Sequence, residues 1–187
     1  LEDIHRAFSI KLWWNFRSRS SLWASFMHAK FCRMAHPNLV FSEKGSEGWR
    51  RMVKVRVLAE RHIGWIVRSE SSNFWFDNWL GTGGLAARLD SVSDHKVADF
   101  VQNGAWDIGR ISQWVPPGIV AEIGRILPPK GSLPDLMIWQ LEPSGCFTLK
   151  TAFSLIQHHS GSSPLFNRIW HPGVPLRVSF FLLRLLR

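Results

Sequence analysis

Apolar side chains recur every fourth residue at the start of the chain, which is the spacing of one face of a helix. We therefore predict a helix over residues 3–17, with Asp3 as its N-terminal cap. Further apolar positions extend this face almost around the helix, so most of the helix should be buried. A short polar break leads to a second predicted helix over residues 21–33, antiparallel to the first. The expected packed side of this second helix carries Leu22, Trp23, Phe26, Met27 and Phe31.

Residues 49–61 are predicted to form a third helix with one basic sector. At about 100° per residue, Arg50, Lys54 and Arg61 fall in a narrow sector opposite the apolar positions. Arg56 lies within the apolar sector, so the two kinds of side chain are not fully separated.

The densest group of aromatic side chains lies at residues 74–79, where four of six residues are Phe or Trp. A β-prone apolar run at 63–67 precedes it after a short polar break, and this pattern predicts a hairpin of residues 63–67 with 73–80. Successive strand residues face opposite ways, so both faces of the hairpin carry aromatic rings. We expect the flanking segments to cover both faces and to bury Trp75.

Glycines at positions 81, 83 and 84 form a flexible break after this hairpin and are the best candidate for a subdomain boundary. Beyond the break, the pattern predicts short helical pieces, a second hairpin and further helices. The predicted elements are helical pieces over 97–102 and 107–115, a helix from 116 to 127, a hairpin of 135–141 with 146–149, a helix over 151–159, a linker over 160–164, and helices over 166–171 and 176–187.

These elements predict a mostly helical α+β fold of N-terminal helices, two aromatic-rich β-hairpins and C-terminal helices. We divide the chain into three parts. Residues 1–80 are a basic helical segment with the aromatic hairpin, residues 81–131 are a helical connector, and residues 132–187 are a hairpin with helices.

The composition is that of a globular protein with a basic surface. The chain has 187 residues, of which 45% are hydrophobic and 20% charged, so it can bury a full core. Eleven Trp against no Tyr give aromatic surface for packing first and for stacking second. The net charge of +9 is concentrated in residues 1–70, which hold 13 Lys and Arg against 6 Asp and Glu. The expected partner is a polyanion, and nucleic acid is the commonest one.

Eight basic residues in this part of the chain are candidates for non-specific contacts with phosphates of RNA or DNA. The alternative is that they form only a solvated basic face. The candidates are Arg17, Arg19, Lys30, Arg33, Arg50, Arg51, Lys54 and Arg61.

Other chemistry has little support in the sequence. His28, Cys32 and His36 have a spacing that suits a transition metal, but a fourth ligand is missing, so no metal and no cofactor are expected. Residues 81–84 lack the Lys and Ser/Thr of a phosphate-binding loop. The carboxylates that a metal nuclease would need are scattered rather than convergent, at Asp77, Asp90, Asp94, Asp99 and Asp107.

The location of the protein is expected to be intracellular, in the nucleus or the cytoplasm. Cys32 and Cys146 make no disulfide framework. The longest apolar run near the end, residues 178–183, is too short to span a membrane. The chain begins without Met and ends in an apolar run, so we expect both ends to be cut from something longer.

The stretch Phe74 to Gly81 resembles the FW-x-DNW signature of plant LINE-type (non-LTR) retrotransposon reverse transcriptases. Other pieces are similar to this family in the same order and spacing across about 180 residues. They are residues 6–15, residues 21–23 with 30–32, residues 145–153, and residues 169–170 with 174–181.

This resemblance implies a place in a reverse transcriptase polyprotein, after the polymerase domain and running into the start of the zinc-binding domain. It implies no catalytic residue and no zinc ligand, because the chain lacks the family's YADD-type motif and stops before the Cys-rich cluster. Leu183 stands where the family usually has Trp. The expected role is therefore non-enzymatic support of nucleic-acid binding, with nucleic acid and the remaining polyprotein as partners and no membrane. The alternatives are a structural or protein-interaction segment, including a decayed element copy, and a metal nuclease.

Overall fold

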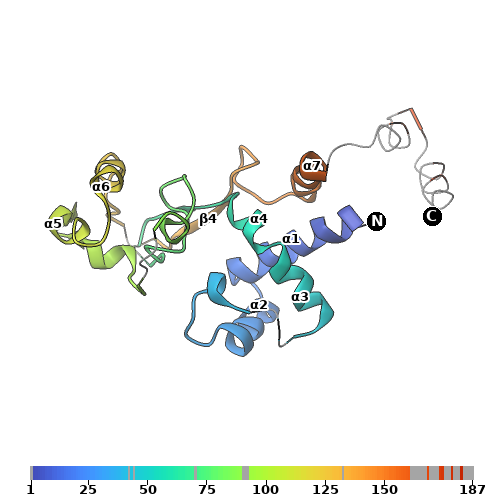
Figure 1. Cartoon of the computed structure of the whole chain (residues 1–187), viewed down its shortest axis with the longest axis horizontal. Helices are drawn as coiled ribbons and strands as arrows, with labels where there is room; N and C mark the ends of the chain where they lie inside the picture. Colours follow the sequence, from blue (N-terminus) through green and yellow to red (C-terminus); the bar gives the residue numbers. More distant parts are fainter. Residues whose placement is uncertain are drawn as a thin grey trace.

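The computed structural model is mostly helical, with 49% helix and 9% strand, which confirms the predicted fold class (Figure 1). It describes residues 2–160, apart from residues 42, 44, 70, 90–92 and 132, together with residues 168, 173, 174, 178 and 182. None of the helices within this described part is long and apolar enough to cross a membrane. The predicted helices over 166–171 and 176–187 and nearly all of the linker over 160–164 lie outside the described residues.

The first helix, α1 (Glu2–Ser18), forms where it was predicted, but it buries only part of the predicted apolar arc. Ile10, Trp13 and Phe16 are fully buried, whereas Phe8 and Leu12 are 47% and 39% exposed. The row of apolar residues at every fourth position is therefore exposed at Phe8 and Leu12 and reaches the core only at Phe16.

The second helix changes its hydrogen-bond spacing part-way along, and this change corrects the prediction of its packed side. The helix α2 (Leu22–Met27) continues into a π-helical turn, η1 (His28–Cys32). The wider turn brings His28 and Cys32 inward, while Leu22, Trp23 and Phe26 are exposed. Only Met27 and Phe31 of the five expected packing residues pack partly against the core.

The predicted third helix is divided in two by Val55, which is not helical in its hydrogen bonding. The two parts are α3 (Glu47–Lys54) and α4 (Arg56–Glu60), and Arg61 caps the second part. Arg50, Lys54 and Arg61 therefore do not share one sector of a continuous helix. A short 3-10 turn, η2 (Pro37–Leu39), precedes these helices.

Both predicted hairpins pair differently in the structure. Strand β1 (Ile63–Ile66) pairs antiparallel with strand β4 (Leu136–Trp139), with Ile63 opposite Trp139. Residues 73–80 do not form a strand, because the Oδ1 atom of Asn73 accepts hydrogen bonds from the backbone N–H groups of Trp75 and Phe76 and turns the chain. Residues 146–148 form no strand either.

A short hairpin that was not predicted lies where a helical piece was expected. A 3-10 turn, η4 (Val97–Phe100), leads into β2 (Val101–Gln102), which pairs with β3 (Ala105–Trp106). Asn103 and Gly104 form the turn with positive φ angles of 53° and 71°, the conformation that favours Asn-Gly in two-residue hairpins. The Asn-Gly pair was the sequence signal for this hairpin.

The buried side chains form two hydrophobic clusters. The first cluster joins α1, α3, α4, β1, β4 and α7 (Leu149–Ser160), and α1 and α7 contact each other. The second cluster lies within residues 74–123 and contains η3 (Leu85–Ala87), α5 (Ile108–Ile111) and α6 (Pro117–Gly124). Trp65 packs against both clusters, and α5 and α6 lie at the far side of the molecule from α1 and α3 (Figure 1). The three-part division of the chain stays a prediction.

Candidate nucleic-acid interface

The aromatic stretch at residues 73–79 is held together by its own polar groups. The indole N–H of Trp79 donates to the carbonyl oxygen of Phe74 at 2.9 Å. The side-chain amide of Asn78 donates to the carbonyl of Ile63 and accepts from the N–H of Gly83. With Phe74 and Trp75 fully buried, the stretch serves the fold and presents no reactive group to solvent.

Arg17 was a candidate phosphate contact, but the structure buries it inside the protein. Its side chain pairs with Glu60 at 2.7 Å and with Asp77 at 2.5 Å, and only 4% of it is exposed. Burial alone would raise the pKa of Asp77, but the charge of Arg17 and a hydrogen bond from His36 lower that pKa to about 2. Asp77 is thus charged and pairs with Arg17 inside the protein, so Arg17 is removed from the candidate contacts.

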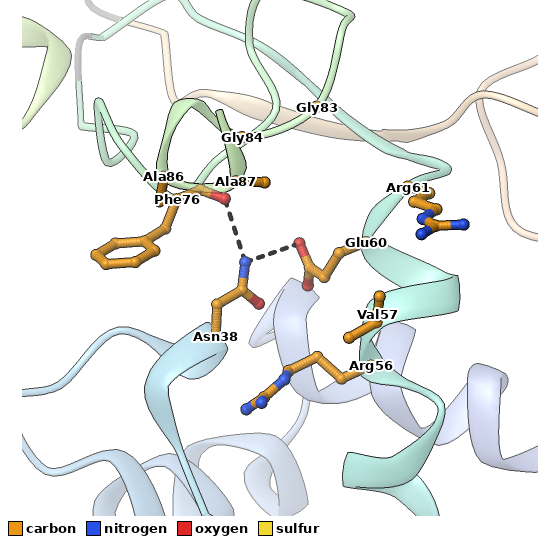
Figure 2. Close-up of a pocket in the computed structure, with 10 residues that line it drawn as sticks. All are labelled: Asn38, Arg56, Val57, Glu60, Arg61, Phe76, Gly83, Gly84, Ala86 and Ala87. Atoms are coloured by element: carbon orange, nitrogen blue, oxygen red, sulfur yellow. Dashed lines mark hydrogen bonds between the residues drawn. The ribbon is translucent and has the colours of Figure 1, made fainter. Parts of the chain in front are cut away.

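This buried ion network continues through His36 and Asn38 to the aromatic stretch. His36 lies 3.1 Å from Asp77 and stacks on the ring of Phe76. The amide of Asn38 donates to the carbonyl oxygen of Phe76 at 3.2 Å and to Glu60 at 3.4 Å, as the dashed lines in Figure 2 show. The network therefore ties the first cluster to the second.

A pocket of about 360 Å³ lies beside Asn38 and Glu60 (Figure 2). Arg61, one of the predicted phosphate contacts, lines this pocket and is exposed. Arg56 lines it too, but its guanidinium donates to the carbonyl of Val40 at 2.7 Å. Neither Arg56 nor Arg61 lines the larger basic groove of the protein.

A larger groove of about 600 Å³ lies where the two clusters meet. Arg19 and Arg33 line it from the first cluster's side, and Lys96 lines it from the second, where Lys96 forms a β-bridge with Asn73. All three cations are exposed, and neither Arg33 nor Lys96 forms an ion pair with any described residue. The groove also holds Asp94, which accepts a hydrogen bond from the Asn73 amide.

The charge of this groove is positive. Its lining contains four cations, Arg17, Arg19, Arg33 and Lys96, and two carboxylates, Asp77 and Asp94. Arg17 and Asp77 neutralise each other inside the wall, so the exposed cations Arg19, Arg33 and Lys96 dominate the accessible surface. The Nε atom of Arg19 lies 3.3 Å from Nε2 of His28, and the Arg19 side chain remains exposed.

The other four predicted contacts do not line the groove. Lys30 lies over the rings of Phe26 and Phe31, 5.8 and 5.3 Å from their centroids. Arg50 pairs with Glu47 on α3, and Arg51 and Lys54 are exposed on the same helix. Lys96 was missed because its place depends on the bridge to Asn73, 23 residues earlier, which no local pattern signals.

The residues considered for metal binding have structural partners instead. His28 stacks on Phe16 and donates to its carbonyl oxygen at 3.0 Å, and burial together with the charge of Arg19 lowers its pKa to about 4. Burial raises the pKa of the Cys32 thiol to about 11, so the sulfur stays protonated. Within the described part of the chain, no group of three or more His, Cys, Asp or Glu is arranged to hold a metal ion.

Two of the scattered carboxylates accept hydrogen bonds from backbone N–H groups. Asp107 caps α5 by accepting from the N–H of Arg110 at 2.9 Å, and Asp99 accepts from the N–H of Lys96 at 2.8 Å. Asp90 lies outside the described residues.

Comparisons with family models, with curated proteins and with solved structures found no match to this chain.

Proposed function

We propose that the chain is a non-catalytic segment that holds the sugar–phosphate backbone of nucleic acid in the groove between its two clusters. The observation that carries this proposal is the pair Arg33 and Lys96, two exposed cations from different parts of the chain that face one groove. Neither cation has a carboxylate partner among the residues that the structure describes. Contacts of this kind position nucleic acid without reading its sequence.

The resemblance to LINE-type reverse transcriptases supports the same role. In that family, the corresponding region lies beside the polymerase domain, which handles template and primer. Within the signature residues, Phe74 to Gly81, Asp77 lines the groove, and so does Asn73, which directly precedes the signature. A segment that shapes a nucleic-acid path needs such residues for the fold and needs no catalytic group of its own.

The proposal is tested by the dependence of affinity on salt. Each phosphate that a cation neutralises contributes a slope of about −0.9 to the plot of log affinity against log salt for duplex DNA, and about −0.7 for a single strand. Binding of a fluorescein-labelled 20-mer is measured by anisotropy between low and physiological salt. We expect Arg33→Ala with Lys96→Ala to flatten the slope by about 1.4 to 1.8.

The matched control removes the same charge elsewhere. Lys11 on α1 and Lys150 on α7 are exposed and do not line the groove. The double variant Lys11→Ala with Lys150→Ala should keep the parent slope. Equal slopes for the two double variants, or binding that does not depend on salt, would refute the groove as the phosphate site.

A second candidate function, a protein-interaction segment, is favoured by one feature on another face. An apolar pocket of about 320 Å³ lies between α1 and α7, lined by Ile4, Ala7, Phe8, Leu149, Lys150 and Phe153. If the parent protein binds no nucleic acid and Phe8→Asp abolishes association with a polymerase segment of the same polyprotein, this candidate replaces the first.

A further inference from the structure

The helix pair α2–η1 exposes two aromatic rings that the core does not use. Phe26 is 62% exposed, although a Phe side chain normally buries most of its surface, and Trp23 is 39% exposed. The π-helical turn at His28–Cys32 produces this arrangement, because it places His28 against Phe16 of α1, buries Cys32 and leaves the preceding turn facing outward. π-Turns of this kind are frequent at functional sites.

One cation lies beside the Phe26 ring, and two more flank the helix in sequence. Lys30 places its ammonium group 5.8 Å from the centroid of the Phe26 ring. Arg19 and Arg33 lie just before and just after the helix pair, and both line the basic groove. The sequence holds no Asp or Glu between Asp3 and Glu43, so no acidic side chain from this segment offsets them.

We propose that Trp23 and Phe26 are a stacking platform for the bases of a single-stranded nucleic acid whose phosphates lie in the groove. This inference rests on the proposed function and adds the strandedness of the ligand. The bases of a duplex are stacked on each other, so only an unpaired strand can offer a base to a protein ring. Charge complementarity selects a polyanion over an apolar partner, because Lys30 lies beside Phe26 and the segment that carries both rings holds Arg19 and Arg33 but no carboxylate.

The test separates base stacking from phosphate contact. Three labelled ligands of the same length are compared by anisotropy: a 20-mer of deoxythymidine, a 20-mer of abasic deoxyribose phosphate with the same charge, and a 20-base-pair duplex. A single stacked base contributes about 5- to 100-fold in affinity. We expect the parent protein to bind the deoxythymidine strand at least about fivefold more tightly than the abasic strand.

The variant Trp23→Ala with Phe26→Ala should reduce this ratio to about one while leaving the affinity for the abasic strand unchanged. Leu22→Ala is the matched control, because Leu22 is 92% exposed on the same helix and has no ring. It should keep the parent ratio. Circular dichroism of both variants should match the parent, since the substituted side chains are exposed and Ala favours a helix.

Each other outcome has a defined meaning. If the parent binds the abasic and deoxythymidine strands equally and its salt slope still depends on Arg33 and Lys96, the stacking platform is refuted and the proposed function stands. If the parent binds none of the three ligands, both proposals fail. If the parent self-associates without nucleic acid and Trp23→Ala with Phe26→Ala abolishes this, the rings belong to a protein interface and the inference is overturned.

Discussion

The two hydrophobic clusters are built in opposite ways. The first cluster needs segments from far apart in the chain, since α1 packs against α7 and β1 pairs with β4. It contains the buried ion pairs of Arg17 with Glu60 and Asp77. The second cluster comes from one continuous stretch, residues 74–123, and its Arg88–Glu122 ion pair lies on its surface at 2.8 Å.

This difference explains why the boundary between the two clusters, here called the seam, is polar. Each cluster covers most of its apolar side chains by itself, so Asp77 and Asn38 can join the two through hydrogen bonds and charge. Asp135 adds a second connection, because its carboxylate accepts hydrogen bonds from the backbone N–H groups of Arg68, Ser69 and Ser72. The same polar seam leaves room for a groove with cations on both sides.

The largest expected effect is the loss of a ring from the second cluster. Trp75 is fully buried, so Trp75→Ala should lower the free energy of unfolding by about 3–5 kcal/mol. Trp114→Ala removes the same side chain from a site that is 38% exposed, so it should cost clearly less than Trp75→Ala. Urea unfolding followed by circular dichroism measures both, and equal losses would contradict the assignment of Trp75 to the core.

The next effect concerns the tie between the clusters. Asp77→Asn keeps the shape of the side chain but removes the charge that pairs with Arg17, which should cost about 2–3 kcal/mol. Glu47→Gln is the control, because Glu47 forms an exposed pair with Arg50. If both substitutions change the unfolding midpoint equally, the buried network does not join the clusters.

Acid should destabilise the fold in two steps. The pKa of His28 is lowered to about 4, so the unfolded chain binds its proton first, and stability should fall as the pH drops below about 6.5. The pKa of Asp77 is lowered to about 2 from 3.8, so its contribution is present above about pH 4 and is lost as the pH approaches 2. That contribution is about 2 kcal/mol.

Unfolding free energies at pH 7, 4 and 2.5 test these two steps separately. Asp77→Asn should remove part of the loss between pH 4 and 2.5, and the hydrogen bonds to Asp135, whose pKa is also lowered to about 2, account for the rest. His28→Gln should remove most of the loss between pH 7 and 4. A parent protein whose stability is constant from pH 7 to pH 2.5 would refute both assignments.

The smallest effect lies on α3, away from the seam. Arg50→Ala should change stability by about 0.5 kcal/mol or less, because its pair with Glu47 is exposed. Arg50→Ala with Lys54→Ala should also flatten the salt dependence of nucleic-acid binding less than Arg33→Ala with Lys96→Ala does. A larger change from the α3 variant would move the phosphate site to that helix.

Local patterns predicted the elements that depend on neighbouring residues. The helices at the two ends of the described chain, α1 and α7, lie where the spacing of apolar residues placed them, and Asp107 caps a helix as its position suggested. The pairing of β1 with β4 could not be predicted in this way, because it joins residues more than 70 positions apart. The side-chain turn at Asn73 competes with a strand, and nothing in the strand pattern itself reveals it.

The candidate site was predictable only in part. Arg19 and Arg33 were named from the basic balance of the first 70 residues, and both line the groove. The sequence does not distinguish Arg17 from these two residues. In the structure, however, Arg17 is buried and pairs with carboxylates 43 and 60 residues away. Exposure of Trp23 and Phe26 could not be foreseen either, because it follows from a π-helical turn rather than from the apolar pattern.

The measurement that tests the groove most directly is photocrosslinking to a single strand that carries 4-thiothymidine at every position. Mass spectrometry of the digested complex identifies the crosslinked peptides. If the groove holds the strand, crosslinks should form on both sides of the seam, within residues 19–37 and within residues 93–97. Crosslinks confined to α3 or to the outer side of α7, or found on one side of the seam only, would contradict it.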